Sequence, residues 1–273
     1  MHAGGLGDIR AGAAIRVSNM FPNGIGKSPD VPPPPGFDWN AWLGGSMPRP
    51  YSPAYVPHNW RGFPDFGCGA IGDMACHILG TPNMAMRLSA SGPVSVECIK
   101  KEGVGKYTFP HQTVIRFDFP ARANMPALKL FWHDSLKAMP EFPGVPKGQL
   151  IGDKDINGSL FMGDKGMVTT GCYGERTRLI PDEKMKDYKL PPQLLTRSPG
   201  HYRDWIRACK GGTPACSNFD EAAPFVTWML LGVIAMKFEG KLDWDAKKLQ
   251  FTNNKEANKY LKPTFHKGWK FFG

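Results

Sequence analysis

The chain has 273 residues, of which 41% are hydrophobic and 21% charged. This length and apolar content are sufficient for a buried core, so a disordered chain is excluded. Lys and Arg exceed Asp and Glu by 34 to 24, which gives a net charge of +10, but the C-terminal lysines are interspersed with acidic residues. A solvated charged face therefore explains the excess better than a nucleic-acid partner does.

The N-terminus and the apolar runs indicate neither export nor a membrane partner. The first residues contain no apolar leader, and the most apolar run, residues 222–236, is interrupted by Pro224 and too short for a bilayer. The location stays open, with the cytoplasm as the default. No two of the six cysteines form a C-x-x-C pair and the seven histidines are scattered, so we expect reduced thiols and no bound metal.

Residues 29–57 contain nine prolines and predict an extended arm, not a helix or a central strand. The arm also carries large aromatic side chains that a solvated tether would not need, namely Trp39, Trp42, Tyr51 and Tyr55. We therefore expect it to lie against the body of the protein or against a neighbouring subunit.

After the arm, the hydrophobic periodicity alternates between helical and strand patterns. Helices are predicted over residues 70–79, 198–211 and 220–240, and strands over residues 94–98, 113–119 and 128–132, followed by a hairpin that turns at 163–166. In the helix over residues 198–211, Ser198 and Pro199 are the expected cap and first turn. Its apolar stripe consists of Tyr202, Trp205, Ile206 and Cys209.

Strands and helices that do not alternate regularly predict the α+β class, with an open, largely antiparallel sheet flanked by helices. We divide the chain into residues 1–60, an N-terminal strand with the Pro-rich arm, and residues 61–273, an α+β domain for substrate binding and oligomerisation.

Gly67, Gly69 and Gly72 fit the pattern G-x-G-x-x-G of dinucleotide-binding loops. That loop requires a preceding strand and an acidic residue about 20 positions later, but Pro64 precedes the glycines and no acidic residue follows Asp73 until Glu97. The glycines are better interpreted as a tight entry into the next helix.

Asp73 and His77 are four residues apart, which places them on one face of that helix. An imidazole can accept a proton from a hydroxyl group near neutral pH, and a neighbouring carboxylate can orient the ring or bind the same substrate. Spacing alone favours a surface ion pair or a structural histidine over this catalytic interpretation.

The segment WRGFPDFGCGAIGDMACHIL resembles the start of the C-terminal domain of the Gfo/Idh/MocA oxidoreductases. FDWNAWLGG and RPYSPAY resemble the arm of one branch of that family, and MGDKGMV, GHYRDWIRACKGGTPACSNFDEAA, LLGVIAMKFEGKLDWD, TNNKEANKYL and GWKF follow in the family order. The resemblance extends over nearly the whole chain.

The resemblance implies a D-x-x-x-H motif at Asp73 and His77, in which the histidine exchanges the proton of a substrate hydroxyl and the aspartate helps to hold a sugar or polyol. It also implies NAD or NADP as cofactor and oligomerisation through the sheet. The family's N-terminal Rossmann domain has no counterpart in the sequence, so this chain resembles the substrate-binding half of a dehydrogenase. It is expected to be inactive without a Rossmann partner, whether it comes from a split or truncated gene or acts with a separately encoded domain. Alternatives are a non-catalytic carbohydrate-binding or dimerisation module, or part of an NAD-dependent glycosidase.

Four further residues are weaker candidates for the substrate site. Arg61, beside Trp60, could bind hydroxyls or a carboxylate, although the sequence favours a structural role of both residues in anchoring the arm. His133, next to Asp134, could line the pocket or form a solvated pair at a strand end. His201 lies in the first turn of its predicted helix and could line a pocket or act as a cap.

Overall fold

The computed structural model describes residues 6–16, 29–103, 105–135, 140–193 and 195–270. These residues form an open nine-stranded sheet in the order β7-β6-β5-β1-β4-β3-β2-β8-β9. The strands are β1 (Ile9–Arg16), β2 (Ser95–Glu102), β3 (Gln112–Phe119), β4 (Leu128–Asp134), β5 (Gly158–Gly163), β6 (Met167–Gly171), β7 (Arg178–Ile180), β8 (Leu242–Asp245) and β9 (Gln250–Phe251). All neighbouring pairs are antiparallel except β1 and β4. The predicted α+β class is confirmed.

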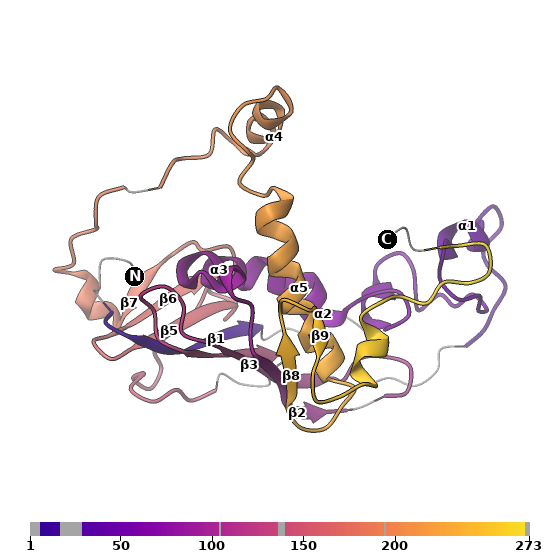
Figure 1. Cartoon of the computed structure of the whole chain (residues 1–273), viewed down its shortest axis with the longest axis horizontal. Coiled ribbons are helices and arrows are strands. Elements are labelled where there is room, and N and C mark those ends of the chain that lie inside the picture. Colours follow the sequence, from indigo (N-terminus) through magenta and orange to yellow (C-terminus); the bar gives the residue numbers. More distant parts are fainter. Residues whose placement is uncertain (1–5, 17–28, 104, 136–139, 194, 271–273) are drawn as a thin grey trace.

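Helices cover one face of this sheet (Figure 1). They are α2 (Gly69–Ile78), α3 (Gly80–Met86), the 3-10 turn η2 (Leu88–Ala90) and the C-terminal half of α5 (Phe219–Ala235). The alternating residues of β3 and β4 that were predicted to be buried point toward them: Ile115, Phe117, Phe119, Leu128, Leu130 and Trp132 are at most 3% exposed. The period-two pattern therefore identified the core side of both strands correctly.

Strand β1 holds the two parts of the sheet together. It pairs in parallel with β4, Ala11 opposite Lys129, and antiparallel with β5, Ala13 opposite Leu160. Ala13 and Ala14 are fully buried on opposite faces of the sheet, where each belongs to a different hydrophobic core. Both faces of β1 are therefore covered by other parts of the protein.

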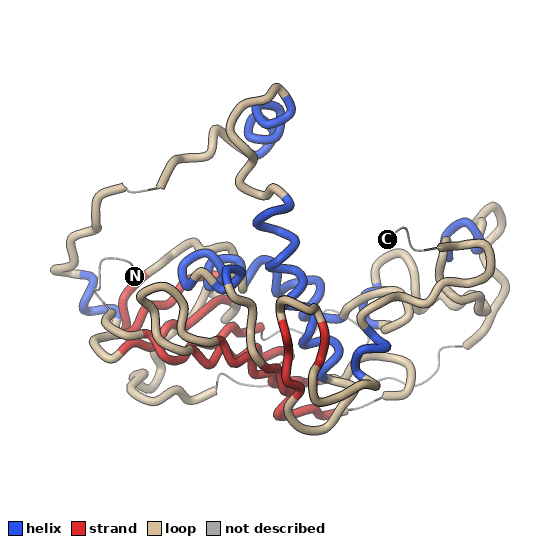
Figure 2. Tube along the Cα trace, in the orientation of Figure 1, coloured by secondary structure: helices blue, strands red, loops and turns tan. Residues whose placement is uncertain are grey.

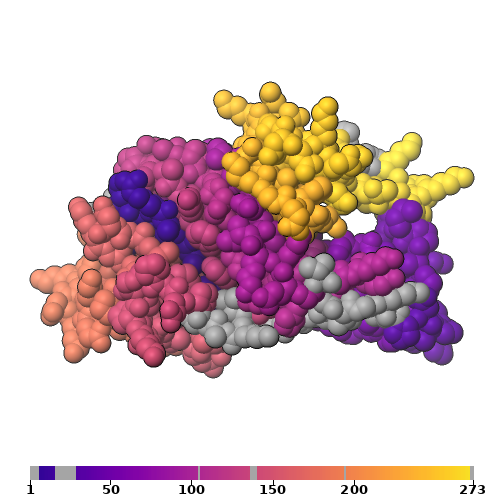
Figure 3. All heavy atoms as spheres, turned by 90° about the horizontal axis from the view of Figure 1, so that it is seen from below, coloured from indigo at the N-terminus to yellow at the C-terminus, as the bar shows by residue number. Residues whose placement is uncertain are grey.

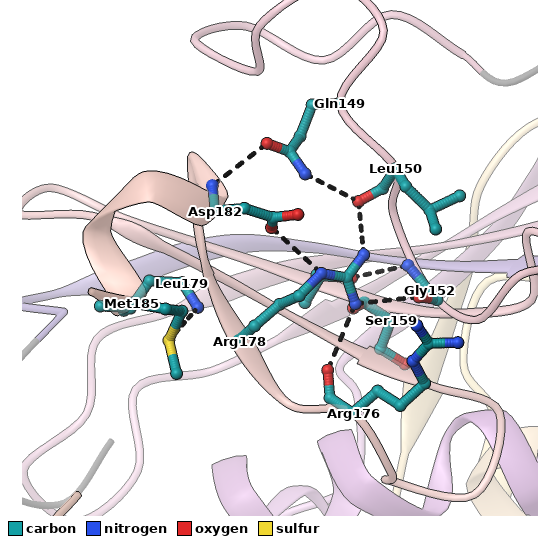
Figure 4. Close-up of polar contacts among 10 residues, drawn as sticks. Gln149, Leu150, Gly152, Ser159, Arg176, Arg178, Leu179, Asp182 and Met185 are labelled. Carbon is teal, nitrogen blue, oxygen red and sulfur yellow. Dashed lines mark hydrogen bonds and ion pairs between the residues drawn. The ribbon is translucent and has the colours of Figure 1, made fainter. Parts of the chain in front are cut away.

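A loop covers the other face of the sheet near β5 and β7, where Ile151 packs against a small second core of residues Ala13, Ile15, Leu160 and Ile180. Arg178 of β7 ties this loop down: it donates to the carbonyls of Leu150 at 2.7 Å and Gly152 at 3.0 Å and pairs with Asp182 at 3.1 Å (Figure 4). Figure 3 looks onto this side of the molecule, where the magenta segments that include β2 and β3 lie in the middle.

The Pro-rich arm differs from the prediction in one respect. Residues Trp39–Leu43 form the short helix α1, because the side chain of Asp38 accepts a hydrogen bond from Ala41 N at its start. The aromatic residues Trp39, Tyr51 and Tyr55 are buried, but in a cluster made largely of the arm's own residues, which Phe63 and Phe66 join from the segment that follows the arm. The 3-10 turn η1 (Asn59–Gly62) leads from the arm to α2.

The late helices are shorter than predicted. α4 (His201–Cys209) begins after Gly200, whose φ of 106° is not helical, and Ser198 Oγ accepts a hydrogen bond from Gly200 N instead of capping the helix. α5 ends at Ala235, several residues before Gly240. α4 stands away from the sheet at the end of a long exposed segment (Figures 1 and 2).

The remaining short elements are the 3-10 turns η3 (Asp182–Met185) and η4 (Ala257–Tyr260). All six cysteines are free. None of the helices in the described part of the chain is long and apolar enough to cross a bilayer.

Candidate functional site

The three glycines of the G-x-G-x-x-G pattern shape the entry into α2. Gly69 has a φ of +64°, and a Cβ atom there would lie 2.9 Å from the ring of Phe109. A Cβ atom at Gly67 would lie 2.6 Å from the backbone of Arg61. The space beside these glycines is thus occupied by other atoms of the protein, which leaves none for a dinucleotide pyrophosphate. The loop also follows a 3-10 turn, whereas a dinucleotide-binding loop follows a strand. The interpretation as a helix entry is confirmed.

The close approach at Gly67 brings Arg61 of η1 beside α2. Arg61 Nε lies 2.9 Å from Asp73 Oδ1, and Arg61 Nη1 donates to the His58 carbonyl at 3.0 Å. The guanidinium also lies over the Trp60 ring, 4.5 Å from its centroid. Both charged side chains of the pair remain just over one-quarter exposed, so the pair is held in place and still accessible to a ligand.

His77 lies one helical turn after Asp73 on the same solvent-facing side of α2. Its imidazole is exposed and meets the ring of Tyr173 edge to face, with the ring centroids 5.2 Å apart. The carboxylate of Asp73 is directed to Arg61 and not to His77. His77 is therefore positioned by an aromatic contact and its nitrogens are open to a ligand.

Tyr173 comes from the tight turn that follows β6. Glu175 holds this turn: its side chain accepts from Tyr173 N at 2.8 Å and its carbonyl accepts from Gly171 N at 2.8 Å. Gly174 packs so closely against the first turn of α3 that a Cβ atom would lie 2.7 Å from Thr81 Oγ1. The turn after β6 thus lies against the start of α3, next to the end of α2, although the turn is far from both helices in the sequence.

The C-terminal end of α2 is also fixed to the sheet. Ser159 Oγ of β5 donates to the carbonyl of Ile78 at 2.9 Å, and Ser159 is fully buried. A carbonyl in the last turn of a helix has no partner within the helix, so this bond both satisfies Ile78 and sets the position of the preceding turn.

This arrangement places a cation, a carboxylate, an imidazole and a phenol ring on one accessible surface. Asp73 can accept hydrogen bonds from hydroxyl groups while the Arg61 fork donates to an oxygen of the same ligand. His77 can take up or release a proton at a neighbouring hydroxyl. We call Trp60, Arg61, Asp73, His77 and Tyr173 the α2 site.

His133 is not part of the α2 site. On β4, Trp132 and Asp134 point toward the helices and His133 points to the opposite face, where it contacts Phe142 at a centroid distance of 6.1 Å. Burial lowers the pKa of His133 to about 4, so the ring is neutral at physiological pH. The expectation that it lines the same pocket is wrong, because consecutive strand residues point to opposite faces.

Asp134 does not form a solvated pair with His133 either. It is 5% exposed and accepts hydrogen bonds from Thr113 N, Thr113 Oγ1 and Trp132 Nε1 at 2.8–3.1 Å. Burial raises the pKa of this carboxyl, while those hydrogen bonds act in the opposite direction. Asp134 is a structural link between β3 and β4.

His201 is exposed on α4, far from α2 in Figure 1, and its ring contacts that of the adjacent Tyr202. The structure thus brings together Trp60, Arg61, Asp73 and His77 of the predicted residues, and leaves out His133 and His201. Tyr173 was missed in the sequence. The one sequence feature that pointed to it was an aromatic residue between two glycines after a hairpin. Its contact with His77 depends on how the turn packs on α3, which the sequence does not reveal.

No three metal-ligating side chains meet anywhere in the described ranges. In a comparison with known protein families, residues 20–106 match the sequence model of the family described as "Oxidoreductase family, C-terminal alpha/beta domain". The match covers η1 and α2, and hence every residue of the α2 site except Tyr173. No protein with a curated description matches the chain.

Proposed function

We propose that this chain provides the substrate surface of an NAD(P)-dependent oxidoreductase that acts on a hydroxyl of a sugar or polyol. The proposal is supported by the match of residues 20–106 to the C-terminal domain model of the Gfo/Idh/MocA oxidoreductases. The observation that carries the proposal is the Arg61–Asp73 pair, 2.9 Å apart, one helical turn from the exposed His77. These three side chains offer complementary donors and acceptors to vicinal hydroxyls.

In this proposal His77 removes the proton from the substrate hydroxyl as the carbonyl forms, and Arg61 and Asp73 hold the neighbouring hydroxyls. Tyr173 keeps the imidazole in position. The hydride would pass to a nicotinamide held by a separate dinucleotide-binding domain, since no protein side chain accepts a hydride and the loop 67–72 is filled by protein atoms.

The first test is binding, which needs no cofactor. Titration calorimetry with D-glucose and with myo-inositol is expected to give saturable binding that Arg61→Met and Asp73→Asn weaken. His201→Asn is the matched control, because His201 is exposed on α4. Equal losses in the control and the α2 variants would show that the ligand does not bind at the α2 site.

The second test is turnover. The purified chain alone should not reduce NAD or NADP with either compound, whereas addition of a purified dinucleotide-binding domain of the same family should permit reduction. In that mixture His77→Asn should lower the rate about a hundredfold, the effect typical of a lost general base. Turnover by the chain alone would refute the division of labour, and full activity of His77→Asn would refute the role of the imidazole.

The second candidate is a non-catalytic module that retains the sheet and holds a carbohydrate. Such a module needs no dinucleotide, which agrees with the absence of room for one in the G-x-G-x-x-G loop at residues 67–72. Under this alternative the sugar still binds at the α2 site, but no partner domain yields turnover. Binding without reconstituted activity would therefore select the module.

A further inference from the structure

α4 presents an apolar stripe that nothing within the described chain covers. Tyr202, Trp205 and Ile206 are 80%, 66% and 44% exposed. The residues that lead to the helix, 186–193 and 195–200, are all exposed as well. A nine-residue helix is marginal in water without tertiary contacts, and large aromatic residues on its surface indicate a docking face.

The polar side of α4 explains why the stripe points outward. Asp204 is buried, pairs with Arg207 and accepts a hydrogen bond from Cys216 N at 2.8 Å. This backbone hydrogen bond is the main cause that lowers the pKa of Asp204. Asp204 thus fastens α4 to its connection with α5, which leaves Tyr202 and Trp205 to solvent.

A groove of about 820 Å³ lies between α3 and the N-terminal half of α5. Met84, Ala215, Ala222 and Phe225 give it apolar walls, and Met84 is 65% exposed and adaptable in shape. The groove and the stripe are thus both apolar: the groove offers alanine, methionine and phenylalanine side chains, and the stripe offers tyrosine, tryptophan and isoleucine.

The charges of the two surfaces are also complementary. α4 and the residue after it carry Arg203, Arg207 and Lys210 against Asp204, three positive charges and one negative. The rim of the groove carries Asp220 and Glu221 against Arg87, two negative charges and one positive. Opposite net charges favour the encounter of α4 with this groove.

We propose that α4 of one copy docks its Tyr202/Trp205/Ile206 stripe into the α3–α5 groove of a second copy, and that the second copy does the same in return. Each chain carries both surfaces, so the exchange satisfies the self-complementarity of a two-fold dimer. α4 follows a long exposed segment, and the hydrogen bond from Cys216 N to Asp204 fixes it to the α4–α5 connection beside the groove with its stripe exposed to solvent. This dimer is independent of the proposed oxidoreductase function.

The test is the oligomeric state of the full chain, measured by sedimentation velocity and light scattering over a wide concentration range. We expect a dimer whose dissociation constant rises roughly 30-fold in Trp205→Ala, as for a tryptophan hot spot. Trp269→Ala is the matched control, since Trp269 is 55% exposed on the C-terminal segment. Unchanged far-UV circular dichroism establishes that the variants fold.

A second pair of variants examines the groove. Ala222→Trp fills it and should weaken the dimer to a similar extent, whereas Ala223→Trp, on the adjacent residue that does not line the groove, should not. A mixture of Trp205→Ala and Ala222→Trp chains retains one intact stripe opposite one intact groove. It should therefore associate more tightly than either variant alone.

The proposal is overturned by a monomer at every concentration, by a dimer that survives both Trp205→Ala and Ala222→Trp and so forms elsewhere, or by a mixture that recovers nothing. It is also overturned if Trp205→Ala leaves self-association unchanged and instead impairs reconstitution with a dinucleotide-binding domain. In that case the stripe docks that domain.

Discussion

The ring of Tyr173, in the turn after β6, meets the ring of His77, near the end of α2, at a centroid distance of 5.2 Å. A residue of the turn after β6 thus contacts the exposed imidazole of a helix residue 96 positions earlier in the chain. The sequence spacing of Asp73 and His77 could place the two groups on one face, and this contact limits the directions in which the imidazole can point.

Removal of this contact should release the His77 ring. In Tyr173→Ala the imidazole gains rotamers, and sugar affinity or reconstituted turnover should fall about three- to tenfold, in keeping with the 0.5–1.5 kcal/mol of an aromatic pair. Tyr173→Phe retains the ring edge and serves as the control. Nuclear magnetic resonance of the His77 ring protons should show the ring-current shift lost in Tyr173→Ala and kept in Tyr173→Phe; equal spectra would contradict the contact.

Arg61→Met should separate ligand binding from stability. The Arg61–Asp73 pair is more than one-quarter exposed, so its loss should change the free energy of unfolding by less than about 1 kcal/mol in urea titrations. Sugar affinity should fall about tenfold or more, because a charged donor to the ligand is lost. Arg61→Lys keeps the positive charge but lacks the planar guanidinium, so its sugar affinity should lie between those of Arg61→Met and the unaltered chain. A large loss of stability without loss of affinity would make the pair purely structural.

Ser159→Ala should destabilise the fold by about 1–3 kcal/mol, because the fully buried hydroxyl donates to the Ile78 carbonyl, which would lose its partner. Chemical denaturation monitored by circular dichroism measures this difference. Ser217→Ala, at an exposed serine, should stay within about 0.5 kcal/mol of the unaltered chain. If both variants unfold at the same denaturant concentration, the Ser159 hydrogen bond does not anchor α2.

His133 should make the fold sensitive to mild acid. Its pKa of about 4 in the folded chain lies below the value of 6.5 expected after unfolding. The unfolded state therefore binds a proton first as pH falls, so the stabilising contribution is complete above about pH 6.5 and is lost toward pH 4.

The comparison is with His133→Gln, which cannot titrate. Between neutral pH and about pH 4.5, the unaltered chain should lose on the order of 2 kcal/mol more of its unfolding free energy than the variant does. Urea titrations at a series of pH values measure both. Parallel pH profiles would mean that His133 reaches solvent in the folded chain.

Local patterns in the sequence predicted the local parts of the fold. The alternation of Ile115, Phe117 and Phe119 identified the core face of β3, and the glycines 163 and 166 identified the turn between β5 and β6. Both signals depend only on residues within a few positions. By contrast, nothing near residues 9–16 encodes a parallel pairing with residues 129–134.

For the site, too, the sequence predicted relations between nearby residues but not contacts between distant ones. Asp73 and His77 lie on one helix face and their relation followed from spacing, whereas the partner of Asp73 depends on the packing of Gly67 against η1. The apolar stripe at Tyr202 and Trp205 correctly indicated a helix, but periodicity does not reveal whether its own chain covers it. His133 was misplaced because a residue next to Asp134 on a strand lies on the other face.

The position of β1 has a consequence for how the chain acquires its structure. Ala11 pairs with Lys129, 118 residues later, and its other neighbour β5 follows still further along the chain. β1 is first in the sequence but pairs with two strands that come much later, so its pairing closes a long loop. This loop closure is expected to slow the folding of the sheet. Until β1 inserts, β4 and β5 both expose unpaired backbone groups, and any molecule trapped at that stage can add a foreign strand at either edge.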